Sequence, residues 1–94
     1  MKSEVTLKGK QMNNSDRNKS LQDVFQRVLE LDSSSDLDTL TYRSIPSWDS
    51  VGHMALVAEI EDVFQVELST QQVLDLSSFN KANEIVELLL KGDR

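Results

Sequence analysis

Residues 48–64 carry the pattern that decides the fold of this chain, and they read WDSVGHMALVAEIEDVF. We expect a helix from about Ser50 to Phe64, because apolar residues recur there at helical spacing, about 100° per residue. The larger apolar side chains form one broad stripe, which is suited to packing against a core. This core stripe consists of Leu56, Val57, Ile60, Val63 and Phe64.

The same helix has a second apolar stripe on almost the opposite side. Acids at positions 59, 61 and 62 prevent burial all round, so one stripe must face something other than the core. We expect the second stripe to be a docking surface for partner proteins, with Glu61 and Asp62 at its far end. The alternative is that Val51 and Met54 pack beneath the preceding loop, against Trp48 or Ile45; partial packing and docking can also coexist. The second stripe consists of Val51, Met54, Ala55 and Ala58.

Three further helices are predicted around this one. Residues 20–23, Ser-Leu-Gln-Asp, resemble a capping box and open a first helix over about residues 20–31. Residues 69–72, Ser-Thr-Gln-Gln, form a capping box that opens a short helix, and a last helix starts near Ser78 or Asn80. The predicted fold is all-α: a small four-helix bundle of three longer helices and one short helix, with a long loop between the first two.

The predicted loop, residues 32–49, lacks clear periodicity but contains apolar residues that can hold it against the core. Its acids at positions 32, 36 and 38 suggest an EF-hand, yet Leu37 stands where that loop needs Gly, and Arg43 where it needs a bidentate Glu. We therefore predict no metal site. The apolar residues expected to hold the loop are Leu37, Leu40, Tyr42, Ile45 and Trp48.

Charge and composition divide the chain and exclude several functions. Residues 1–19 carry five Lys/Arg and two Asp/Glu, and we expect them to be a flexible leader. Residues 20–94 carry five Lys/Arg and fourteen Asp/Glu, and we expect them to form the domain. A domain charge of −9 repels nucleic acid and favours basic protein surfaces. The absence of Cys excludes disulfides and thiol catalysis. No segment of the sequence predicts membrane insertion or secretion, so we expect a cytoplasmic protein. We also expect it to be a monomer.

Ser50, in the stretch Ser47-Trp48-Asp49-Ser50, has three possible roles from the residues alone. A catalytic nucleophile needs a base and an orienting group, and the sole histidine, His53, projects closer to the core side, so no catalytic residue is predicted. A helix cap at Asp49 or Ser50 is ordinary chemistry. A point of covalent attachment is the third role, because a helix N-terminus favours a phosphate on an exposed serine.

Asp49-Ser50-Val51 resembles the Asp-Ser-Leu signature of the acyl carrier proteins and related carrier domains that hold 4′-phosphopantetheine. The resemblance covers about residues 20–92 and includes residues 55–64, ALVAEIEDVF, which are similar to the family's second helix. The residues on either side of the signature resemble those of stand-alone carriers of specialised pathways. These residues are Trp48 before it and Gly52-His53 after it. Val51 departs from the usual Leu, and Gly52 and Ala55 stand where fatty-acid carriers often have acids.

The resemblance implies a non-catalytic carrier. Ser50 would hold 4′-phosphopantetheine transferred from coenzyme A by a phosphopantetheinyl transferase, with Asp49 helping to position the serine. The arm would carry acyl or aminoacyl groups as thioesters in fatty-acid, polyketide, peptide or related biosynthesis. The partners would be a loading ligase, synthase or transferase that meets Val51, Met54, Ala55, Ala58, Glu61 and Asp62.

One other function is open: an unmodified, carrier-like helical bundle that acts as an interaction or regulatory subunit. His53 also has two interpretations. It tunes charge near the phosphate, or it is a hydrogen-bonded structural residue at a helix end, which we favour because no second ligand or nucleophile lies near it in the sequence.

Overall fold

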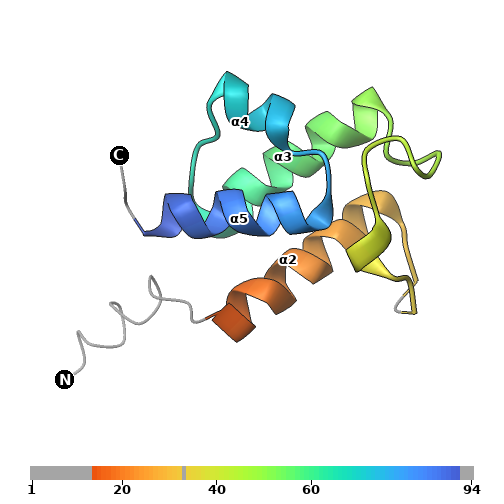
Figure 1. Cartoon of the computed structure of the whole chain (residues 1–94), viewed down its shortest axis with the longest axis horizontal. Coiled ribbons are helices and arrows are strands. Elements are labelled where there is room, and N and C mark those ends of the chain that lie inside the picture. The colour runs from red at the N-terminus through yellow and green to blue at the C-terminus, as the bar shows by residue number, and fades with distance from the viewer. Residues whose placement is uncertain (1–13, 33, 92–94) are drawn as a thin grey trace.

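The computed structural model describes residues 14–32 and 34–91 of the chain, and this part is helical (Figure 1). No strand occurs among these residues, where the single β-contact is an isolated bridge between Thr41 and Ser78. The prediction of an all-α bundle with three longer helices and one short helix is confirmed. In chain order the elements are α2 (Asn14–Leu29), the 3₁₀ turn η1 (Leu37–Thr39), α3 (Ser50–Phe64), α4 (Thr70–Asp75) and α5 (Phe79–Leu90).

The core forms where α2 packs against both α3 and α5 (Figure 1). Phe25 of α2 lies at its centre and makes edge-to-face contacts with Trp48, at 5.4 Å between ring centroids, and with Phe79, at 5.1 Å. Such pairs add stability beyond the apolar area they bury. Three segments far apart in the sequence therefore meet at one phenyl ring.

The first helix begins at Asn14 and not near Ser20, so its predicted start is wrong by six residues. Residues 14–19, which we expected to belong to a flexible leader, are the first turn and a half of α2, whereas residues 1–13 lie outside the described part. Arg17 shows why the helix extends. Its Nε donates to Asn83 Oδ1 at 3.2 Å, and its Nη2 lies 3.8 Å from Glu87 on α5.

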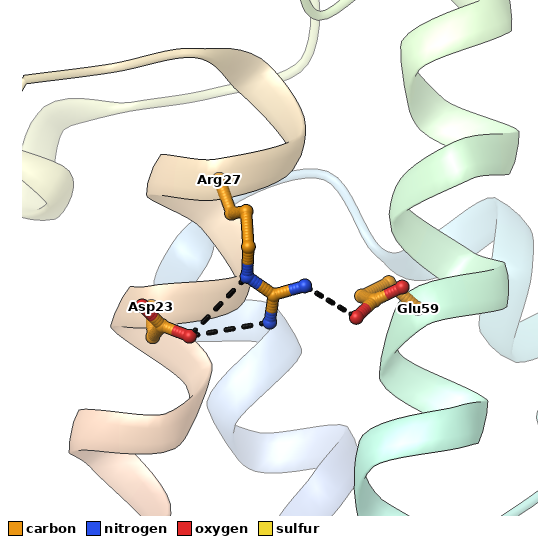
Figure 2. Close-up of polar contacts among 3 residues, drawn as sticks. All are labelled: Asp23, Arg27 and Glu59. Carbon is orange, nitrogen blue, oxygen red and sulfur yellow. Dashed lines mark hydrogen bonds and ion pairs between the residues drawn. The ribbon is translucent and has the colours of Figure 1, made fainter.

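A second arginine connects α2 to α3. Figure 2 shows the Arg27 guanidinium between Asp23, one turn earlier on α2, and Glu59 of α3. The hydrogen bonds to Glu59, and then those to Asp23, raise the pKa of Arg27 above its ordinary value. The group is exposed, so solvent screening limits its contribution, and the contact serves mainly to align the two helices.

Residues 30–49 connect α2 to α3 and lie against the core at three buried side chains, Leu37, Leu40 and Trp48. Backbone contacts join this connection to the chain just before α5, where the Tyr42 N–H donates to the Ser77 carbonyl at 2.8 Å. Two acids stabilise its turns: Asp36 caps η1, and Asp32 accepts from the hydroxyls of Ser34 and Ser35. These bonds, those from Ser34 first, lower the pKa of Asp32.

The residues that cap α4 and α5 are the ones expected from the sequence. At Ser69 the capping box is complete, since Ser69 Oγ accepts from the Gln72 N–H and Gln72 Oε1 accepts from the Ser69 N–H. Ser78 caps α5 by accepting from the Lys81 N–H at 3.0 Å. None of the described helices is long and apolar enough to cross a membrane.

Candidate functional site

Asp49 is the residue that caps α3. Its backbone is extended, and its Oδ1 accepts a hydrogen bond from the Gly52 N–H at 2.9 Å. Its carbonyl accepts the first bond of the helix, from the His53 N–H at 2.8 Å. Of the two capping residues left open by the sequence, the structure selects Asp49, and an aspartate in this position stabilises a helix by about 1 kcal/mol.

Ser50 is thereby relieved of any capping role. It is the first residue of α3, its side chain is exposed, and its hydroxyl makes no hydrogen bond with any other residue in the described part of the chain. The hydroxyl of Ser50 is therefore accessible to another molecule, and the fold does not use it. The helix N-terminus around it favours negative charge.

The presence of glycine at position 52 is explained by a close contact within the protein. An ideal Cβ built at this position would lie 2.0 Å from the carbonyl oxygen of Ser47. The connection before α3 therefore passes so close to the first turn of the helix that only a residue without a side chain fits. The close approach at this glycine is made by the protein's own backbone.

His53 links three segments. Trp48 Nε1 donates to His53 Nδ1 at 3.0 Å, and His53 Nε2 lies 2.8 Å from the carbonyl oxygen of Val73 on α4. An indole nitrogen can only donate, so Nδ1 is the acceptor and the ring proton lies on Nε2, which donates to Val73. The structural interpretation of His53 is confirmed, and because both nitrogens are engaged, the ring is not placed to act as a base for Ser50.

The second stripe of α3 is exposed along its length. Val51 is 76% exposed and Met54 55%, and Ala55 and Ala58 are exposed as well. Val51 and Met54 are therefore not buried beneath the loop. In the core stripe four residues are buried as expected, but Val63 is 38% exposed and does not belong to the core.

The two acids at the far end of α3 differ in their surroundings. Glu61 is half-buried, and its Oε2 accepts a hydrogen bond from the Leu68 N–H at 2.9 Å, so it helps to hold the chain that leads to α4. Asp62 is exposed. Both line an open depression of about 650 Å³ that also contains Ala58 of the second stripe.

A smaller pocket, of about 310 Å³, lies at the other end of α3, beside the start of the helix. Asp49, the immediate neighbour of Ser50, belongs to its wall. Arg43 also lines it, a residue that we considered only as a failed calcium ligand. One feature of the sequence distinguishes this residue: Arg43 is the only Lys or Arg between residues 28 and 80. The remaining lining residues are Ser44, Ile45, Pro46 and Trp48.

The described residues contain no cluster of three or more His, Cys, Asp or Glu side chains that could hold a metal ion. The site therefore consists of an unbonded serine hydroxyl at a capped helix start, a pocket with one cation beside it, and an exposed apolar stripe that leads away. Comparisons with known proteins do not extend this description, since no family model, curated protein or solved structure matches the chain.

Proposed function

We propose that this protein is a carrier that holds 4′-phosphopantetheine on Ser50 and is not itself a catalyst. The observation that supports this most directly is that the residue that caps α3 and the residue with the free hydroxyl are different residues. Asp49 supplies the cap, so the exposed hydroxyl of Ser50 has no partner within the described residues. The resemblance of Asp49-Ser50-Val51 to the carrier signature supports the same function.

Loading would be a phosphoryl transfer carried out by a separate enzyme. Ser50 Oγ attacks the coenzyme A phosphorus that bears pantetheine and forms a phosphodiester. The bond from that phosphorus to the oxygen bridging to the adenosine side breaks, and adenosine 3′,5′-bisphosphate leaves. The serine proton passes to a base of the transferase. On the carrier, the start of α3 supports the added negative charge through its helix dipole.

The loaded arm would hold an acyl or aminoacyl group as a thioester and present it to successive enzymes. Tethering replaces encounters with free substrate by delivery at a high effective concentration. The exposed second stripe begins one residue after Ser50, so a partner that docks there lies next to the arm. Asp62 near its far end would favour partners with basic surfaces through contacts that salt weakens.

Intact mass spectrometry tests this function. The purified chain is incubated with coenzyme A, Mg²⁺ and a phosphopantetheinyl transferase of broad specificity. We expect a mass gain of one phosphopantetheine on the wild type and none on Ser50→Ala, with Ser47→Ala as the matched control that still gains it. No gain on the wild type would overturn the proposal and favour an unmodified interaction subunit that uses the same exposed stripe. An equal gain on Ser50→Ala would overturn the assignment of the arm to Ser50, because the chain would then be modified at another residue.

A further inference from the structure

Arg43 is an isolated cation in an acidic region. Between residues 28 and 80 the chain has ten Asp and Glu but no other Lys or Arg. No carboxylate of the described residues lies within ion-pair distance of the Arg43 guanidinium, although four of the other five described cations, all but Lys19, make such pairs. Its Cζ lies 6.0 Å from the centroid of the Tyr42 ring. The positive charge is thus left without a counter-charge from the residues that the structure describes.

The backbone at Arg43 has an unusual conformation for an arginine. Its φ is 70°, in the left-handed region that Gly and Asn adopt at lower cost. Glu30 and Gln65 also have positive φ, but each lies at the end of a helix, where this conformation is common. Arg43 ends no helix. Its N–H donates to the Trp48 carbonyl at 2.9 Å and closes a tight loop, for which no arginine side chain is required.

Arg43 also lines the 310 Å³ pocket next to the start of α3. Asp49 lies on the wall of the same pocket and is followed directly by Ser50. The pocket is open to solvent, and Ile45, Pro46 and Trp48 contribute to its lining.

We propose that Arg43 binds the phosphodiester formed on Ser50 and thereby fixes the base of the prosthetic arm against this pocket. This assignment rests on the proposed carrier function. A guanidinium is suited to the task because its planar array of N–H donors can form two parallel hydrogen bonds to phosphate oxygens, which a lysine cannot match. It also offsets the repulsion between the new phosphate and the carboxylate of Asp49.

Nuclear magnetic resonance on the apo and holo forms tests the proposal. We expect the Arg43 Nε–H resonance to shift when Ser50 is loaded, whereas that of Arg27, already paired with Glu59, stays in place. The ³¹P resonance of the arm should shift in holo Arg43→Asn, and to a smaller extent in Arg43→Lys. Holo Arg27→Gln is the matched control and should keep the wild-type ³¹P resonance.

The Asn variant is chosen because it tolerates the left-handed backbone, so its melting temperature should not fall. An unchanged ³¹P resonance in a folded, fully loaded Arg43→Asn would overturn this assignment and leave the carrier function intact. Failure of the wild type to load would overturn both. A third arm compares acetyl and malonyl cargo: an Arg43 response that appears only with malonyl would assign the arginine to a carboxylate on the cargo and overturn the phosphodiester assignment.

Discussion

Gly52 is a residue at which helix propensity and packing point in opposite directions. In a helix an exposed Gly→Ala change usually stabilises, by about 1 kcal/mol. Here the added Cβ would meet the Ser47 carbonyl oxygen at 2.0 Å. We expect Gly52→Ala to lower the free energy of unfolding by about 1–3 kcal/mol, as overpacking does. Urea denaturation followed by circular dichroism measures the change.

The control for Gly52 is Ala55→Gly on an exposed position of the same helix, where propensity alone predicts a loss of about 1 kcal/mol. A Gly52→Ala variant more stable than the wild type would show that the connection before α3 moves away freely.

His53 gives a second prediction at this scale. His53→Phe keeps a flat ring but leaves the indole N–H of buried Trp48 without its acceptor. A buried donor left unsatisfied costs about 1–3 kcal/mol, so we expect a loss of that size in thermal or urea unfolding. In a double-mutant cycle on a Trp48→Phe background the same change should cost less, because the donor is already absent. Equal costs in both backgrounds would contradict the bond.

The individual residues also show what sequence patterns can and cannot identify at the site. The motif around Ser50 pointed to the correct helix start, because a cap acts over three or four residues of chain. The contact of Ser47 with Gly52 and the bonds of His53 to Trp48 and Val73 depend on how separate segments fold back on one another. Arg43 was overlooked for the same reason: its pocket exists only after the loop closes.

At the scale of elements, α3 has one face buried in the fold and another exposed to solvent. Leu56 is buried and Met54 is 55% exposed on the same helix, which makes them a matched pair. Leu56→Ala should lower stability by about 2–5 kcal/mol. Met54→Glu should change it by less than about 0.5 kcal/mol. Under the proposed function, Met54→Glu should nevertheless slow loading by the transferase or a cargo enzyme.

Steady-state loading rates at fixed carrier concentration, together with urea titrations, separate the two effects. A Met54→Glu variant that unfolds would mean that Met54 belongs to the core, and one that loads at the wild-type rate would mean that this part of the stripe is not used.

The two faces of α3 were predictable because helical geometry alone divides the side chains. Val63 lies at the edge of its stripe and is 38% exposed, because the burial of an edge position depends on how the neighbouring helices pack and not on helical spacing alone. The start of α2 was wrongly predicted for a related reason. Ser20 satisfies the local capping pattern, but the bonds that keep residues 14–19 helical come from α5, more than sixty residues later.

At the scale of the whole molecule, Arg17 makes residues 14–19 part of the folded unit. Its side chain is only 11% exposed and binds Asn83 and Glu87 of α5. We expect a chain that begins at residue 20 to be less stable than one that begins at residue 14, and Arg17→Ala in the full chain to lose about 1–3 kcal/mol. Lys19→Ala, at an exposed position nearby, is the control and should change stability by less than about 0.5 kcal/mol.

Thermal melts of these four proteins provide the measurement. Equal melting temperatures for the chains that begin at residues 14 and 20 would restrict the folded unit to residues 20 onward, as the charge pattern first indicated.

Trp48 has a practical consequence for the study of this protein. It is the chain's single tryptophan, it is buried, and it lies two residues before Ser50 with its indole bound to His53. The molecule thus contains an intrinsic fluorophore at the place where a prosthetic group would be added. Its emission spectrum reports on the packing around α3 without any label, so unfolding can be followed in real time from one optical signal, and under the proposed function so can loading.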